Sequence, residues 1–459
     1  MAGGKDFLLG RIRSGESLTL GQQIKLSGLL SYPAIIAQLS TVVMQYIDAS
    51  MVGHLSAAAG ASIALVSTCL WLLGGFCFAL CNGFSVQVAH LVGANDFKEA
   101  RSVVRQALTC ALVWGGLFAL LGVCVARPLP HWLGGNPDIV ENAYRYFLIN
   151  CLFLPFMQID FMSATLLQCS GEMRVPSLLN IAMCVMDVGF NYIFIYVLDF
   201  GVPGAALGTG CAEVVTATLM TCYMAFKSKE LRFAHERGSF IPTKRTLSKA
   251  AKIGLPMCLE NVVMRGAYIA GTVIVAPLGT IAIAANGFAV TAESFCYMPG
   301  YGIADASTTL VGQSLGAGRK DLATRLAWIT TSGGMIIMTL MAVVMAIFAP
   351  QLMAMLSPDP EVISLGAKML RIEAFAETMY AASIVAFGCC VGAGDTLVPS
   401  CMNFGSMWLF RILPATFLCP IMGLKGYWIA MCVELNIRGS IFLMRLAMGR
   451  WRNAYKAEA

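Results

Sequence analysis

The chain has 459 residues, of which 58% are hydrophobic and only 12% are charged, and its mean hydropathy is +0.73. Soluble domains carry about 25% charged residues, so this composition excludes a water-soluble protein and predicts a chain that crosses a membrane many times. The formal net charge of +6 does not indicate nucleic acid as a partner, because the basic residues are spread over the breaks between apolar runs.

Cysteine and histidine usage indicates neither a disulfide framework nor a metal site. The 17 cysteines are scattered through apolar segments without framework spacing, so we interpret them as small packing residues. Only 4 histidines are present, and no His/Cys cluster supports a structural metal, so we expect no cofactor. Residues 1–25 are polar and mildly basic, which favours a cytoplasmic leader over a cleavable signal peptide.

Apolar runs between charged or Gly/Pro-rich breaks predict about twelve membrane-spanning helices. In chain order they cover residues 24–54, 61–92, 103–127, 142–169, 176–198, 202–226, 253–277, 280–312, 323–350, 363–391, 399–420 and 427–445. The predicted fold class is therefore an all-α polytopic membrane protein, embedded in a lipid bilayer. An even number of spans places both chain ends on one side of the membrane.

The basic residues indicate which side that is. They gather at alternate breaks: before the first span, after the second and eighth, in residues 227–252, and in the tail. By the positive-inside rule, both chain ends and the 227–252 segment face the cytoplasm.

The two halves of the chain repeat each other. Matching residues recur 223 positions apart, as Pro33 with Pro256, Pro137 with Pro360, Gly171 with Gly394, and Pro176 with Pro399. A constant offset of this kind indicates two six-helix repeats. We therefore divide the chain into a cytoplasmic leader (1–25), a first lobe (26–226), a basic linker (227–252), a second lobe (253–446) and a tail (447–459). Because six is even, the repeats are parallel, which suits a central cavity that opens alternately to each side.

One span of the first half carries a carboxylate and an amide four residues apart, Asp187 and Asn191. This spacing puts both on one helix face. A charge at membrane depth is costly, so such an acid usually faces a cavity, a partner or an ion path. We rank an ion or proton site first, and a structural hydrogen bond to a neighbouring helix is the alternative. Asp48 in the first span is a second candidate, although it could also reach the outer interface.

Spans of the second half contain further ionisable residues, which we assign to a substrate cavity: Glu260, Arg265, Glu293 and Glu377. Acids beside aromatic rings would attract small organic cations. Arg411 and Arg438 could instead neutralise some of these acids. Other acids within the spans could be structural, namely Asp160, Glu213, Asp305 and Glu434.

Proline positions predict where helices bend. Pro33 can loosen the first span, and the cluster around Pro299 and Gly300 is expected to break or bend the eighth. Broken helices at membrane depth normally line a cavity, because their freed backbone groups need partners.

Enzyme motifs are not found. The sequence contains no P-loop and no Ser/His/Asp or Cys/His set with a plausible place in a water-filled site. The interpretation is a transporter driven by an ion gradient rather than an enzyme.

Over residues 26–445 the sequence resembles the multidrug and toxic compound extrusion (MATE) family. The resemblance rests on the order of these segments: Asp48-Ala-Ser-Met-Val-Gly53, Val92-Gly-Ala94, Gly171-Glu-Met-Arg-Val-Pro176, Asp187-Val-Gly-Phe-Asn191-Tyr-Ile-Phe-Ile-Tyr196, Gly204-Ala-Ala-Leu-Gly-Thr209, Gly254-Leu-Pro256, Met298-Pro-Gly300, Leu310-Val-Gly-Gln-Ser-Leu-Gly-Ala317 and Gly392-Ala-Gly-Asp395-Thr.

The resemblance implies an antiporter of the bacterial inner membrane that exports cationic drugs in exchange for Na+ or H+. It implies two lobes around a V-shaped cavity and a monomer. The family's cation site would comprise Asp48, Asp187, Asn191 and Thr209, and its helix-one proline would be Pro33. Many relatives have Asn first and Asp second in helix five, and this chain has the reverse order.

Two other readings remain open. A flippase for a lipid-linked or anionic precursor would need a basic cavity, which Arg265, Arg411 and Arg438 could supply in part. A channel or a membrane-embedded enzyme is the third reading, and drug-dependent ion flux would distinguish a transporter from it.

Overall fold

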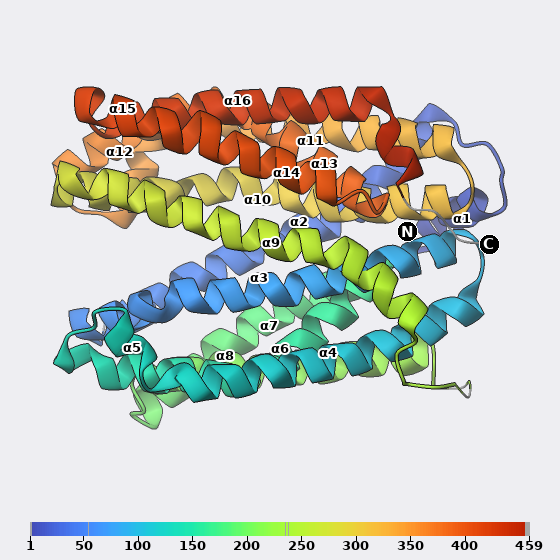
Figure 1. The fold of residues 1–459 in the computed structure, drawn as a ribbon, viewed down its shortest axis with the longest axis horizontal. Helices are drawn as coiled ribbons and strands as arrows, with labels where there is room; N and C mark the ends of the chain where they lie inside the picture. The colour runs from blue at the N-terminus through green and yellow to red at the C-terminus, as the bar shows by residue number, and fades with distance from the viewer. Residues whose placement is uncertain (1, 54, 235, 237, 455–459) are drawn as a thin grey trace. The chain divides into compact units, whose positions relative to one another are not determined.

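The computed structural model describes residues 2–454 apart from 54, 235 and 237, and every regular element in that part is a helix (Figure 1). The first half contains α1 (Ala2–Arg13), α2 (Leu20–Gly53), α3 (Ala57–Gly93), α4 (Phe97–Ala126), α5 (Leu129–Trp132), α6 (Pro137–Cys169), α7 (Arg174–Tyr192), η1 (Ile193–Val197), α8 (Val202–Cys222) and η2 (Tyr223–Lys227). The second half contains α9 (Lys244–Val275), η3 (Ala276–Leu278), α10 (Thr280–Gly316), α11 (Lys320–Leu356), α12 (Pro360–Glu373), α13 (Glu377–Gly392), α14 (Leu397–Ser406), η4 (Met407–Ile412), α15 (Leu413–Met422), α16 (Leu424–Met448) and η5 (Arg450–Asn453).

Within the described residues, 10 helical segments are long and apolar enough to cross a membrane, and the bent pair α12 and α13 makes up to 11. The remaining predicted span corresponds to α16, which has 25 residues but carries several charged side chains. Each predicted span thus corresponds to one helix or to two or three consecutive helical elements. The predicted all-α polytopic fold class is confirmed.

Helix breaks differ from the expectation. Helix α10 runs continuously through Pro299 and Gly300, so the break considered there does not occur. A proline removes one backbone hydrogen bond, which neighbouring helices can compensate in a membrane protein. The sharp break lies instead between α12 and α13, which meet at 61°.

The chain packs into two compact units. One comprises Ser40–Cys258 and the other Met1–Leu39 with Leu259–Ala459. In the first unit, α6 packs against α3, α4 and α8, and α7 packs against α8. In the other unit, α10 packs against α11 and α13, and α13 packs against α16. The unit boundaries follow Leu39 in α2 and Cys258 in α9. The predicted lobes start earlier in the same two helices, at residues 26 and 253, and the lobe boundaries remain predictions.

Small residues allow close helix packing in the second half. Gly388 and Gly392 lie one turn apart on α13 and face α10. A Cβ atom added to Gly388 would lie 2.7 Å from the carbonyl oxygen of Ala304, and one added to Gly392 would clash with the backbone of Thr308. Small residues at this spacing bring helix backbones together where van der Waals packing drives association.

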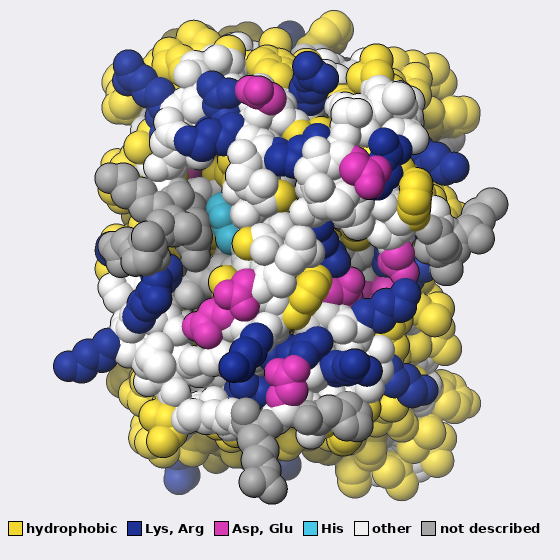
Figure 2. Space-filling model, turned by 90° about the vertical axis from the view of Figure 1, so that its right-hand side faces the viewer, with side chains coloured by type: hydrophobic (Ala, Val, Ile, Leu, Met, Phe, Trp, Pro, Cys, Tyr) yellow, Lys and Arg dark blue, Asp and Glu magenta, His cyan; other side chains and the backbone are white. Residues whose placement is uncertain are grey.

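Basic side chains are prominent on the surface that Figure 2 views. Lys and Arg side chains are spread over it among a few Asp and Glu side chains, and apolar side chains lie mostly toward its margin. The side of the membrane that the basic residues face remains a prediction from the sequence.

Candidate ion-coupling site

Helix α7 presents the two polar residues that the sequence singled out. Asp187 and Asn191 are separated by one turn and are 0% and 1% exposed. Because neither side chain is exposed, both lie within the helix packing of their unit rather than in lipid, although the rest of α7 is largely apolar.

Asn191 connects two carboxylates. Its Nδ2 donates to Asp187 Oδ2 at 3.1 Å and to Asp48 Oδ1, on α2, at 3.0 Å. The two carboxylates are therefore neighbours and repel each other when both are ionised. A proton or a metal cation between them would relieve that repulsion. The structure thus brings Asp48 of α2 together with the two polar residues of α7, as predicted for the ion site.

Two oxygens of this cluster accept no hydrogen bond from the described residues. Asp187 Oδ1 and Asn191 Oδ1 are buried, and neither accepts a hydrogen bond from any described residue. Thr209 on α8 places its hydroxyl beside the Asp187 carboxylate, and this hydroxyl donates to Ala205 O at 3.2 Å. Carboxylate, amide and hydroxyl oxygens are the ligands preferred by hard cations. The arrangement can hold a proton or a small cation such as Na+.

A glycine on α8 lets the site form. A Cβ atom at Gly208 would lie 2.8 Å from the backbone nitrogen of Asn191 and would clash with its side-chain oxygen. Helices α7 and α8 therefore approach each other closely at the polar cluster. This residue was not among the predicted site residues, because its role depends on a contact between two helices.

Further acids lie in the same unit. Asp160 on α6 is 4% exposed, and its Oδ1 accepts no hydrogen bond from a described residue. Glu213 on α8 is close enough to interact electrostatically with both Asp160 and Asp187. The sequence placed both acids inside spans but gave no reason to group them with Asp187.

The acids of the other unit have different surroundings. Glu260 on α9 accepts hydrogen bonds from Ser400 Oγ at 2.6 Å and from Asn403 Nδ2 at 2.5 Å. Arg265, one turn further, lies with its guanidinium carbon 5.9 Å from the ring centroid of Tyr268. The hydrogen-bond donors of Glu260 thus lie on α14, and the ring beside Arg265 lies on its own helix, α9.

Three buried glutamates form a second acidic cluster. Glu293 is 5% exposed, and Glu373 and Glu377 are 0% exposed. They are close enough for their charges to interact. All four carboxylate oxygens of Glu373 and Glu377 are buried without a hydrogen-bond partner among the described residues. Glu373, which was not among the predicted cavity residues, therefore belongs to the same cluster as Glu293 and Glu377, which were.

One acid of this unit is fully neutralised. Glu434 on α16 accepts hydrogen bonds from Arg411 NH2 at 2.7 Å and from Arg438 Nε at 2.6 Å, and Ser406 donates to it as well. The carboxylate is 0% exposed, and both arginines are buried. Neutralisation by Arg411 and Arg438, the alternative considered for the second half, therefore applies to Glu434.

Comparison with known proteins identifies the family. The MatE family model matches residues 33–193 and again residues 256–417, so it matches once in each repeat, and the two matches begin 223 positions apart. The chain belongs to the MATE family of transporters. The family that the sequence resembles is thereby confirmed.

Relatives of known name match almost the whole chain. The probable multidrug resistance protein NorM of Thermotoga maritima is 25% identical over 433 residues, which cover 92% of this chain and 92% of that protein. The multidrug resistance protein MdtK of Yersinia pestis is 25% identical over 439 residues, covering 92% of this chain and 94% of that protein.

Solved structures share the fold. The Vibrio cholerae MATE transporter VcmN in its bent form superposes with a TM-score of 0.86 at 18% identity, covering 95% of this chain and 98% of that one. A MOP superfamily transporter from Pyrococcus furiosus gives a TM-score of 0.88 at 19% identity, covering 96% and 100%. At this identity the likeness concerns the fold alone.

Proposed function

We propose that this protein is a secondary antiporter that exports cationic, often aromatic drugs or toxic organic compounds in exchange for Na+ or H+. It would act in the bacterial inner membrane with both chain ends in the cytoplasm. The observation that carries this proposal is the cluster of the half-buried Asp48 with the buried Asp187 and Asn191, in which two buried oxygens accept no hydrogen bond from a described residue. Relatives named as multidrug resistance proteins support the choice of cargo.

The ion would occupy the space between the two carboxylates. Na+ would take oxygens from Asp48, Asp187, Asn191 and Thr209, whereas H+ would bind one carboxylate and be shared with the other. Either ion removes a negative charge from the site. Pro33 lies in the same helix as Asp48 and leaves one backbone carbonyl without its helical donor, so α2 can bend as the charge at Asp48 changes.

The drug would be held by acids and rings of the other unit. Glu293 precedes Tyr297 by one turn on α10, and the rings of Tyr301 and Tyr380 lie 6.1 and 5.7 Å from that of Tyr297. Buried carboxylates supply the charge interaction, and the tyrosine faces supply cation–π contact. Glu377 adds a second carboxylate beside this aromatic group.

The flippase reading has less support. An anionic cargo requires free basic groups, but Arg411 and Arg438 are both bonded to Glu434. The Pyrococcus furiosus transporter is described as having a binding pocket of reverse polarity that suggests a different function. Among the described residues, carboxylate and amide oxygens are the commonest buried side-chain atoms without a hydrogen-bond partner, which favours a cationic cargo.

Transport assays test the proposal. Pump-deficient cells that express the protein should accumulate less ethidium, and proteoliposomes should show drug-dependent flux under a Na+ or an H+ gradient imposed separately. Asp48→Asn and Asp187→Asn should each lower export by roughly a hundredfold, because each removes a charged partner of the ion. Asp199→Asn is the matched control, since Asp199 lies exposed in a turn with a φ of 54° that Asn also tolerates.

Normal export by both site variants would place the coupling elsewhere. Ion flux without any drug would support a channel instead.

A further inference from the structure

The two repeats contain the same turn but cap the following helix differently. Between α3 and α4, Asn95 has a φ of 60°, and the N-cap residue Asp96 accepts a hydrogen bond from Glu99 N at 3.1 Å. The same turn occurs 223 positions later, where Gly318 has a φ of 74° and Arg319 is the N-cap of α11. The N-cap φ and ψ angles are −88° and 71° in the first turn and −98° and 71° in the second.

Arginine reverses the chemistry of this cap. A guanidinium only donates hydrogen bonds, so Arg319 cannot accept one from the helix amides, and α11 has no side-chain cap. In the first repeat the backbone amide of Glu99 donates to the carboxylate of Asp96. The corresponding amide of Leu322 has no such carboxylate, because position 319 is an arginine. Open amides at a helix N-terminus favour an anion. A basic residue at the cap position strengthens that preference.

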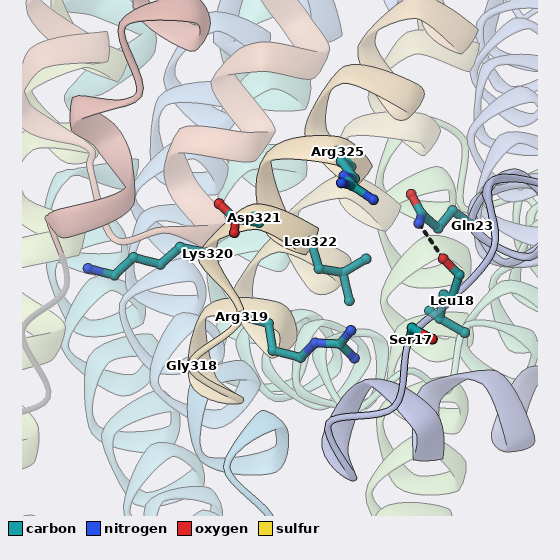
Figure 3. Close-up of a pocket in the computed structure, with 9 residues that line it drawn as sticks. All are labelled: Ser17, Leu18, Gln23, Gly318, Arg319, Lys320, Asp321, Leu322 and Arg325. Carbon is teal, nitrogen blue, oxygen red and sulfur yellow. Dashed lines mark hydrogen bonds between the residues drawn. The ribbon is translucent and has the colours of Figure 1, made fainter.

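A pocket of about 550 Å³ lies at this position. Its lining residues come from the segment before α2 and from the start of α11: Ser17, Leu18, Gln23, Gly318, Arg319, Lys320, Asp321, Leu322 and Arg325. Figure 3 shows Arg319 and Arg325 reaching into the same space beside Leu322, whereas Lys320 and Asp321 extend to the other side.

Neither of the two arginines is neutralised. Arg319 NH1 donates to the carbonyl oxygens of Glu16 at 2.7 Å and Arg11 at 3.2 Å, which carry no charge. Arg325 is exposed and has no hydrogen bond or ion pair with any described residue. Two guanidinium groups thus share one cavity without a carboxylate partner, and planar guanidinium groups suit phosphate oxygens.

Gln23 independently indicates a ligand. Its side chain is 2% exposed, and its Nε2 donates to Leu18 O at 2.8 Å. Its Oε1 is buried without a donor among the described residues, and Figure 3 shows this oxygen turned to the side of the pocket where Arg325 lies. A buried acceptor without a partner is costly. A ligand that carries a hydrogen-bond donor next to its negative charge would satisfy Gln23 and both arginines.

We propose that this pocket binds a phosphate ester that carries a hydrogen-bond donor, supplied by the headgroup of an anionic phospholipid. The pocket lies where two candidate membrane spans begin, α2 at Leu20 and α11 at Lys320, and the ends of such spans reach the lipid headgroups. Phosphatidylglycerol has the required negative phosphate and hydroxyl donors. Phosphatidylcholine is neutral overall, and its quaternary ammonium donates no hydrogen bond. Free phosphate offers the same chemistry from solution.

Thermal unfolding in nanodiscs tests this site. The purified protein is measured in phosphatidylcholine alone, in phosphatidylcholine with phosphatidylglycerol, and in phosphatidylcholine with inorganic phosphate added. We expect phosphatidylglycerol to raise the unfolding temperature, because a ligand that binds only the folded state stabilises it. A rise with inorganic phosphate would identify a soluble source for the same anion site. The absence of a rise in both arms would overturn the proposal.

Variants separate the pocket from general charge effects. Arg319→Asp gives α11 the cap that Asp96 gives α4, and Arg325→Gln removes an exposed guanidinium without disturbing packing. Each should weaken the phosphatidylglycerol response by about tenfold in lipid concentration, because each removes a charge-assisted hydrogen bond. Lys98→Gln is the control, since Lys98 is an exposed basic residue in the equivalent turn of the first repeat. Equal responses in all three variants and the unmodified protein would show that the lipid acts outside the pocket.

Discussion

Asp187 and Asn191 in the first repeat correspond, 223 positions later, to Phe410 and Pro414 in the second, and Asp48 corresponds to Gly271. Both repeats match the same family model and keep the same order of helices. The backbone plan is therefore duplicated, and the polar chemistry at membrane depth is not. Repeated folds need similar packing in both copies, but a buried charge is kept only where it has a use or a partner.

The buried acids of the two units also differ in their hydrogen-bond and ion-pair partners. In the first, one amide joins two carboxylates and no described basic side chain bonds to either. In the second, Glu434 has two arginines, whereas the side chains of Glu373 and Glu377 have no hydrogen-bond partner in the part of the chain that the structure describes. The comparison separates acids that hold the structure together from acids left open to an ion or a cargo. Glu434 belongs to the first kind, and Asp187, Glu373 and Glu377 belong to the second.

The largest effect should come from breaking the neutralised cluster. Glu434→Gln leaves Arg411 and Arg438 buried beside an uncharged amide, which should destabilise the protein by about 3–5 kcal/mol. We expect a large loss of yield and a lower unfolding temperature in detergent. Glu141→Gln is the control, because Glu141 forms an exposed pair with Arg145 on α6 and such pairs contribute about 0.5 kcal/mol. A Glu434→Gln protein that is stable but does not transport would show that Glu434 takes part in transport rather than in holding the structure together.

The geometry at Gly208 offers the next test. Gly208→Ala would push α8 away from Asn191 and so displace the amide from the two carboxylates. Because small misplacements in a site are costly, export should fall by roughly tenfold to a hundredfold. Gly189→Ala on α7 is the matched control, since a Cβ there meets no atom within 4 Å. Ethidium accumulation measures both, and equal export by the two variants would argue against a precisely packed ion site.

Much of the fold could be predicted from local patterns. Hydropathy located the spans, and the four-residue spacing placed Asp187 and Asn191 on one face. Helix breaks could not be predicted in this way. Helix α10 is continuous through Pro299 and Gly300, whereas the 61° break after α12 falls at residues 374–376, which contain neither proline nor glycine. Tertiary packing decides where a helix breaks when neighbouring groups can satisfy the backbone.

The candidate site was predictable only in part, for the same reason. The sequence offered Asp48 either as a site residue or as an acid at the outer interface. It could not decide between the two, because the bond of Asp48 to Asn191 joins residues 143 positions apart. The grouping of Glu373 with Glu293 and the contact at Gly208 likewise depend on helices that meet in space. Spacing within one helix is readable from sequence, and contacts between helices are not.

The open acids of the second unit should affect substrate more than coupling. Glu373→Gln with Glu377→Gln removes two buried charges and keeps the side-chain shape, so the fold should be retained. We expect the apparent affinity for a cationic drug to fall about tenfold, because a charge interaction of roughly 1.4 kcal/mol or more is lost. Ion flux per drug molecule should be unchanged. Glu361→Gln, an exposed acid of α12, is the control, and a change in ion stoichiometry would contradict the proposed division between the units.

The smallest effect is expected when the site keeps its groups and exchanges their places. The double variant Asp187→Asn with Asn191→Asp still has one carboxylate and one amide a single turn apart on α7. Asp48 would then face a carboxylate directly at position 191 rather than the amide that now bridges to it. Export should remain within about tenfold of the unmodified protein, because the number of charged ligands is unchanged.

The ratio of Na+-driven to H+-driven flux should shift, because the distance between the two carboxylates decides whether they share a proton or surround a larger ion. Loss of export as complete as in Asp187→Asn alone would show that the order of the two residues, and not only their presence, determines coupling.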